Sequence, residues 1–294
     1  MSVDLRLTRT HGRETVVMAP MRETVLVTKT AIPDGGMVIW TGKSGLGKTK
    51  TAEWFRDSLD QTFDPSDPLT FRARYLQSGT FSRGDQEKQA IRSLYATVHG
   101  APLTHYGYNR YGPSELAELV VIGLQRKGIR LLLIDEAGCL SLNAIRGMVL
   151  VTDIAKDMEW PTSLVLIGMD ELPETVERLP QIESRIHAWC HFEPYDFDLT
   201  KQFLAALHEH FSGLKAGNQA LEAEARYIYE TFGGIARPTA YFLRQVDDRA
   251  QELGCAIDLD VLIAVREMLV SGRTGTMAEK ESYKSKPAKG KKRA

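Results

Sequence analysis

The chain has 294 residues, with 37 Lys and Arg, 38 Asp and Glu, and 43% hydrophobic residues, which is the composition of an ordinary soluble globular protein. No apolar run approaches the roughly 20 residues of a membrane-spanning helix, and the first residues lack the apolar core of a secretory signal. Three widely spaced cysteines (Cys139, Cys190 and Cys255) form no C-x-x-C pair. We therefore expect a cytoplasmic protein with reduced cysteines.

The net charge of −1 hides a basic C-terminus. Residues 284–294 contain six of the 37 basic residues and no acid, which leaves 31 basic against 38 acidic residues elsewhere. Because this end is rich in Lys, Pro and Gly, we expect a disordered basic tail over residues 271–294. Such a tail could add affinity for nucleic acid or an acidic partner, or it could be only a solubilising end.

The first informative pattern is a strand that leads into a glycine-rich loop. Residues 1–30 before it contain two β-like stretches, Glu14–Met18 and Thr24–Thr28, and are predicted to form an N-terminal arm. Met37–Thr41 is typical of a buried strand, and Lys48–Leu59 has apolar residues at helical spacing. Between them, the pattern G-x-x-x-x-G-K-[ST] is matched by Gly42, Lys43, Ser44, Gly45, Leu46, Gly47, Lys48 and Thr49.

This loop predicts a site for nucleotide phosphates because each fixed residue has a role there. Glycines allow backbone N–H groups to turn toward a phosphate where a Cβ would crowd the approach. Lys48 supplies a positive charge for the β- and γ-phosphates, and the Thr49 hydroxyl is a Mg²⁺ ligand. The alternative is a chance turn rich in Gly and Lys. The strand before and the helix after argue against it.

A strand and two helices are predicted between residues 69 and 125. Leu69–Leu76 alternates polar and apolar residues, as a strand does. Asp85–Val98 and Pro113–Gln125 have helical periodicity, and Gly100–Gly112 between them is a loop rich in His and Tyr.

The same segment supplies the candidates for contact with DNA. From Ser78 to Tyr111, basic and hydroxyl groups alternate with aromatic residues, a mixture that suits sequence-independent contact with phosphates. The candidate residues are Arg83, Lys88 and Arg110. The alternative is a solvated helix face beside a Tyr-rich packing loop.

Two adjacent acids end the next buried strand. Arg130–Glu136 is an apolar run closed by Asp135 and Glu136, as in a central parallel strand buried on both faces. Ligands bind at the carboxyl ends of such strands in open α/β sheets. Asp135 is therefore a candidate to hold Mg²⁺ through water, and Glu136 is a candidate general base for the attacking water. Taken alone, the pair could also be a solvated strand end.

The remaining elements complete an α/β part followed by an all-helical part. A helix over Ser141–Met158 precedes two further strands, Thr162–Ile167 and Ile186–Phe192. From Asp198 onward only helical periodicity is present, over Leu199–Phe211, Asn218–Phe232, Arg237–Leu253 and Leu259–Leu269. Five strands alternating with helices predict a doubly wound parallel sheet.

From Thr30 to Leu269 the order of motifs resembles that of an AAA+ ATPase. An extra strand between the loop strand and the acidic strand, with a glutamate directly after the Mg²⁺ aspartate, is typical of the additional-strand catalytic-glutamate ATPases. The resemblance implies a five-stranded parallel sheet sandwiched by helices over residues 31–196, followed by a helical lid over residues 197–270. It also implies ATP and Mg²⁺ as cofactors, and slow, assembly-dependent ATP hydrolysis.

Further site residues follow from the resemblance. Asp170 stands near the sensor-one position, although a helix N-cap is an equal alternative. Leu179–Ile186 resembles the segment whose Ser-Arg pair presents an arginine finger to a neighbouring subunit, which makes Arg185 a third catalytic candidate beside Lys48 and Glu136. Arg178 is the fallback for this role. The alternative for Arg185 is a surface arginine paired with Glu183 or Glu177.

A last motif lies in the helical part. Gly233–Pro238 resembles the sensor-two motif, whose arginine would here be Arg237 and would contact the nucleotide. An ordinary helix N-terminus also accounts for Gly, Arg and Pro at this place.

Within AAA+ proteins the run Leu164–Leu172 is similar to that of transposition regulators of the TniB, TnsC and Mu B type. This resemblance implies a homo-oligomer, a ring or filament, that forms with ATP on double-stranded DNA and recruits a transposase, with a target-selector protein as a further candidate partner. Hydrolysis would then drive disassembly. The alternatives are a replication initiator or helicase loader, and a nucleotide switch that binds protein and no DNA.

Overall fold

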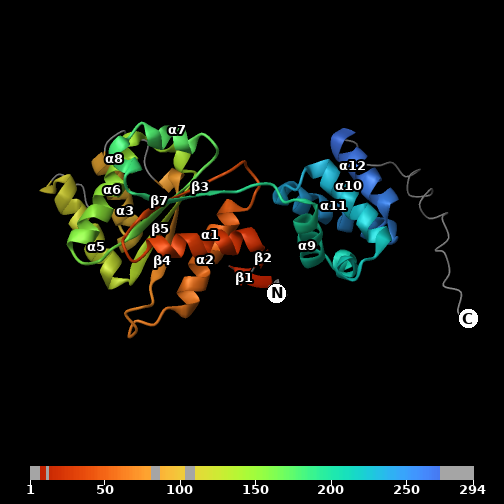
Figure 1. Ribbon diagram of the computed structural model, residues 1–294, viewed down its shortest axis with the longest axis horizontal. Helices are drawn as coiled ribbons and strands as arrows, with labels where there is room; N and C mark the ends of the chain where they lie inside the picture. Colours follow the sequence, from red (N-terminus) through yellow and green to blue (C-terminus); the bar gives the residue numbers. More distant parts are fainter. Residues whose placement is uncertain (1–6, 11–12, 81–86, 103–109, 272–294) are drawn as a thin grey trace, which may run out of the picture. The chain divides into compact units, whose positions relative to one another are not determined.

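A computed structural model describes residues 7–10, 13–80, 87–102 and 110–271 of the chain (Figure 1). The chain divides into two units, Met1–Glu193 and Pro194–Ala294. Residues 272–294 of the predicted basic tail, and Arg83, lie outside the described residues. No helix in the described ranges is long and apolar enough to cross a membrane.

The first unit is built on a parallel sheet of five strands in the order β4-β5-β6-β3-β7. The strands are β3 (Met37–Thr41), β4 (Arg72–Gln77), β5 (Ile129–Asp135), β6 (Ser163–Ile167) and β7 (Ile186–His191). Every residue of β3 and β6 is buried, because helices cover both faces of a parallel sheet. The predicted five-stranded parallel sheet is confirmed.

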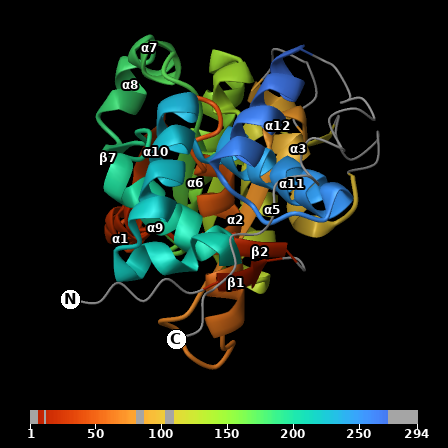
Figure 2. The same ribbon diagram turned by 90° about the vertical axis from the view of Figure 1, so that its right-hand side faces the viewer.

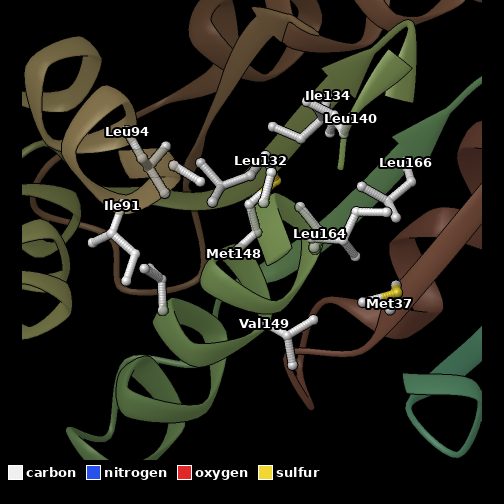
Figure 3. Packing of buried hydrophobic residues seen from close by; sticks show 14 of the residues in the cluster. Met37, Ile91, Leu94, Leu132, Ile134, Leu140, Met148, Val149, Leu164 and Leu166 are labelled. Atoms are coloured by element: carbon white, nitrogen blue, oxygen red, sulfur yellow. The ribbon is translucent and has the colours of Figure 1, made fainter. Parts of the chain in front are cut away.

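Helices α3 (Glu87–His99), α5 (Pro113–Arg126) and α6 (Leu142–Asp157) cover one face of this sheet through a single apolar cluster. Figure 3 shows its centre, where Met148 of α6 packs beside Leu132 of β5 and Leu164 of β6. On the opposite face lie α1 (Ala19–Ala31) and α2 (Lys48–Thr62). Ile39 of β3 belongs to the first cluster, and its neighbour Trp40 faces the other side of the sheet because successive residues of a strand alternate. The indole N–H of Trp40 donates to Thr28 Oγ1 of α1 over 3.0 Å. The sheet is therefore sandwiched.

The strand predicted over Thr24–Thr28 is wrong, because these residues lie within helix α1. Pro20 stands in the first turn of this helix, and the buried residues Met21, Val25, Thr28 and Ala31 recur at helical spacing. The helix packs against β3 and β7. Burial against the sheet thus overrode the β-propensity of this β-branched stretch.

The stretch predicted over Glu14–Met18 overlaps β2 (Arg13–Val16), which pairs antiparallel with β1 (Leu7–Thr10). Figure 2 shows this hairpin beside α2, which β1 contacts.

Strand β6 separates the loop strand β3 from the acidic strand β5 in space. In the sequence, β4 and helices α3 and α5 separate them, but β4 lies at the edge of the sheet. Two short helices, α7 (Leu172–Glu177) and α8 (Pro180–Glu183), connect β6 to the other edge strand, β7.

Within its described residues the second unit has helices and no strand, as expected. They are α9 (Phe197–Leu207), a 3₁₀ helix (Glu209–Ala216), α10 (Gln219–Phe232), α11 (Ala236–Leu253) and α12 (Leu259–Ser271). These helices share a core of their own that includes Leu204, Phe211, Ile228, Phe242 and Val265.

Candidate nucleotide-binding site

The glycine-rich loop follows β3 and has a backbone that only glycine adopts easily. Gly42, Gly45 and Gly47 have φ angles of 137°, 87° and 96°. A Cβ on Gly42 would lie 2.5 Å from the carbonyl oxygen of Phe192, the residue that follows β7. The loop is therefore held close to the neighbouring strand end, and a side chain at position 42 would not fit there.

Lys48 begins α2 and lies over this loop. Its ammonium group donates to the carbonyl oxygens of Gly42 (2.5 Å) and Lys43 (2.8 Å), and the residue is only 9% exposed. Within the loop, Leu46 is buried, whereas Lys43 and Ser44 are exposed. The positive charge of Lys48 and the N-terminus of α2 thus occupy the same place, which is the arrangement that binds anions.

Thr49 and Asp135 meet at the carboxyl edge of the sheet. Thr49 Oγ1 donates a 2.7 Å hydrogen bond to Asp135 Oδ2, and the backbone N–H of Glu136 donates to Asp135 Oδ1 over 2.8 Å. Asp135 is 6% exposed. A hydroxyl and a carboxylate are the hard oxygen ligands that Mg²⁺ prefers, so these two residues fit the predicted metal site.

Glu136 has a left-handed backbone, with φ 56° and ψ 35°, which is unusual for a residue with a Cβ. The residue is exposed. The Ser78 hydroxyl, at the end of β4, donates to Glu136 Oε2 over 3.5 Å. The carboxylate therefore lies near the Mg²⁺ candidates and remains accessible to water.

Two residues of this site, Tyr75 and Ser78, were not predicted from the sequence to belong to it. The Tyr75 hydroxyl donates to Asp135 Oδ2 over 2.7 Å. Burial, together with this hydrogen bond, raises the pKa of Tyr75, so its hydroxyl stays protonated as a donor. The sequence signal for Tyr75 was the alternation of side chains along β4. This alternation puts Tyr75, a residue with a polar hydroxyl, on one face of the strand, two residues before the strand ends.

Asp170 follows β6, and its carboxylate lies 4.0 Å from His191 Nδ1. The N-cap of α7 is Glu171, so the alternative interpretation of Asp170 as a helix cap is wrong. The sensor-one assignment of Asp170 stays a prediction.

Arg185 lies between α8 and β7 and forms an ion pair with Asp153 of α6. The side chains are 42% and 45% exposed. The surface ion pair proposed as an alternative therefore exists, but its acid is Asp153 and not Glu183 or Glu177. Arg178, the fallback candidate, is exposed at the end of α7.

Arg237 is exposed in the first turn of α11, within the second unit. The two glycines of its motif have a structural role: Gly233 ends α10, and Gly234, with φ 73°, packs against the backbone of Tyr195. Contact of Arg237 with a nucleotide stays a prediction.

Of the DNA candidates, Lys88 lies in the first turn of α3 and Arg110 is exposed before α5. Their contact with DNA also stays a prediction.

Comparison with known proteins agrees with this geometry. Residues 33–176 match the family model described as AAA domain, whereas no curated protein matches the sequence significantly. The fold is similar to that of the ORC2 protein of Aeropyrum pernix in its ADP form, with a TM-score of 0.57 and 16% identity over 84% of this chain and 66% of that chain.

Two further solved structures have similar folds. The ORC1 protein of Aeropyrum pernix in complex with DNA has a TM-score of 0.55 and 17% identity over 86% of this chain and 66% of that chain. Domain III of the replication initiation protein DnaA from Thermotoga maritima has a TM-score of 0.52 and 16% identity over 85% of this chain and 92% of that chain. The chain thus spans just under two thirds of both ORC proteins. Residues 33–176 are therefore similar in sequence to an AAA domain, and the chain has the AAA+ fold.

Proposed function

We propose that this chain is a Mg²⁺-dependent ATPase whose nucleotide state controls its assembly on duplex DNA. The ATPase part is carried by one observation, the hydrogen bond that joins Thr49 of the glycine-rich loop to Asp135 beside Glu136. This bond supports the proposal because the glycine-rich loop, the two candidate metal ligands and the candidate general base all lie at one edge of the sheet. ATP is preferred to GTP as the substrate because of the AAA domain, and no N-K-x-D guanine motif is apparent in the sequence.

The residues would divide the reaction between them. Lys48 and the loop amides bind the phosphates, and Thr49 and Asp135 hold the metal. Bound Mg²⁺ would neutralise charge on the β- and γ-phosphates. Glu136 takes a proton from a water molecule as the water oxygen bonds to the γ-phosphorus, and the bond from this phosphorus to the bridging oxygen of ADP breaks. Arg185 of one copy would stabilise the transferred phosphoryl group in a neighbouring copy, and Arg237 and Asp170 are the further candidates for contact with a nucleotide.

The DNA part of the proposal is supported by a similar solved structure and by the sequence. The similar ORC1 structure contains DNA, and the candidates Arg83, Lys88 and Arg110 lie in one segment of the chain. The resemblance of Leu164–Leu172 to transposition regulators favours a protein that marks target DNA for a transposase. A replication initiator or helicase loader is the second candidate, because DnaA domain III has a similar fold.

Assembly is tested by negative-stain imaging of the full chain with plain duplex DNA and a nonhydrolysable ATP analogue. We expect rings or filaments with the wild type and none with Lys48→Ala. Lys50→Ala is the matched control, since Lys50 lies two residues further along α2 and is exposed, paired with Glu53. Particles that ignore both DNA and nucleotide would contradict the proposal and favour a protein-directed switch.

A second experiment separates the two DNA-linked candidates. The chain is added either to a purified transposase with its transposon ends, or to a purified replicative helicase with unwound DNA. Stimulated insertion that depends on ATP and Lys48 supports the transposition regulator. Helicase loading with the same dependence supports the initiator type.

A further inference from the structure

Two hydroxyl groups donate to the same oxygen of Asp135. Thr49 Oγ1 and the Tyr75 hydroxyl each lie 2.7 Å from Asp135 Oδ2. The other carboxylate oxygen, Oδ1, accepts from the backbone N–H of Glu136 over 2.8 Å. Both oxygens of this buried carboxylate are thus fixed by donors from α2, β4 and the end of β5.

The register of the sheet explains how Tyr75 reaches this position. In the parallel pair of β4 and β5, Tyr75 is opposite Leu133, and Gln77 is opposite Asp135. Residues two apart on a strand share a face, so Tyr75 lies on the same face as Asp135 and one pleat below it. The long phenol side chain spans this distance.

Helix α2 covers Tyr75 and restricts its ring. The helix packs against β4, and the guanidinium of Arg56 lies 5.8 Å from the centre of the Tyr75 ring. The phenol is partly buried beneath the same helix that carries Thr49 at its N-terminus. A fixed ring presents its hydroxyl in one direction, which makes Tyr75 a constraint on the carboxylate.

The carboxylate needs such a constraint because its terminal torsion is soft. The χ2 angle of aspartate has a broad distribution, so the oxygens turn easily when nothing fixes them. A turn of the Asp135 carboxylate would move Oδ2 away from Thr49 and misalign the two candidate Mg²⁺ ligands. Hydrogen bonds to an ionised acceptor are roughly twice as strong as neutral ones, so the Tyr75 hydroxyl opposes this turn effectively.

We propose that Tyr75 is a positioning residue for the metal site, which acts through Asp135 and sets how much Mg²⁺ the protein needs to bind nucleotide. This inference rests on the proposed function, since it assigns Tyr75 to the same metal site. Partners of metal ligands typically contribute about 10-fold or more to metal affinity. Removal of the hydroxyl should therefore raise the Mg²⁺ requirement by about 10-fold and leave metal-free nucleotide binding unchanged.

The test measures binding of a fluorescent ATP analogue to the full chain while Mg²⁺ is titrated. Tyr75→Phe keeps the ring and removes only the hydroxyl. Tyr95→Phe is the matched control, because Tyr95 is a partly buried tyrosine of α3 that stacks on His99, in the same unit and outside the site. We expect a shifted Mg²⁺ midpoint for Tyr75→Phe alone and equal affinities of all three proteins in EDTA.

A double-mutant cycle with Asp135→Asn distinguishes positioning from a general packing role. If Tyr75 acts through the carboxylate, adding Tyr75→Phe to Asp135→Asn should change the Mg²⁺ midpoint little further. Additive effects would overturn the inference, as would equal midpoints for Tyr75→Phe and the wild type. Thermal unfolding of each variant confirms that it is folded. A wild-type chain that binds no nucleotide at any Mg²⁺ concentration would instead refute the proposed function, and the inference with it.

Discussion

Thr49 and Asp135 are 86 positions apart in the sequence and are joined by a 2.7 Å hydrogen bond from Thr49 Oγ1 to Asp135 Oδ2. The bond connects the first turn of α2 to the carboxyl end of β5, two strands away from β3 in the sheet. Two residues from separate motifs thus form one candidate metal site.

Lys48→Ala should weaken ATP binding by about 10- to 100-fold, since it removes a charge-assisted contact to the phosphates. Isothermal titration calorimetry with ATP and Mg²⁺ measures the change. Lys50→Ala should bind like the wild type, because Lys50 is an exposed residue of the same helix, paired with Glu53. Equal losses in both variants would show that charge near the helix start matters and that Lys48 has no specific role.

Glu136→Gln should retain ATP binding and lower the hydrolysis rate by about 100-fold or more, because the amide cannot accept the proton of the attacking water. Phosphate release measured at saturating ATP separates this effect from binding. Glu159→Gln is a close control: Glu159 is also an exposed glutamate with a left-handed backbone, at φ 57°. Hydrolysis by Glu136→Gln at the wild-type rate would remove Glu136 from the general-base role.

Arg185→Ala should lower hydrolysis by the assembled protein by about 1,000-fold if this arginine reaches the phosphates of a neighbouring copy. Asp153→Asn breaks the same ion pair but keeps the arginine, so its hydrolysis should stay at the wild-type level. The free energy of unfolding should change by less than about 1 kcal/mol in Asp153→Asn, since the pair is solvent-exposed.

Hydrolysis rates on assembled protein decide between the two roles of Arg185. An equal loss in Arg185→Ala and Asp153→Asn would mean that the ion pair itself matters. No loss in Arg185→Ala would exclude this residue as the arginine finger and make Arg178 the next residue to test.

Gly234→Ala should lower the free energy of unfolding of the helical unit by about 3 kcal/mol, because an added Cβ would meet the Tyr195 carbonyl at a positive φ angle. Gly254→Ala is matched to it: Gly254 has φ 63°, but nothing lies within 4 Å of its added Cβ. That change should cost only about 1 kcal/mol of backbone strain. Chemical unfolding followed by circular dichroism compares the two, and equal costs would contradict the steric explanation.

The predictions from sequence were most accurate where a pattern is local. The five strands and most of the helices follow from periodicity within single segments, and the glycine-rich loop is contiguous with the strand and helix that support it. The failure at Thr24–Thr28 has the same origin: β-branched residues favour a strand locally, and only the sheet beneath α1 selects the helix.

The tertiary structure alone decided which distant residues meet. Strand order puts β6 between β3 and β5, and the register of β4 with β5 brings Tyr75 to Asp135 and Ser78 to Glu136. The tertiary structure also gives Arg185, which lies between α8 and β7, a partner 32 positions away, Asp153 of helix α6. Sequence determined most of the elements, the glycine-rich loop and the acidic strand end, because each depends on neighbouring residues. Contacts between elements depend on the order and register of parallel strands, which no local pattern specifies.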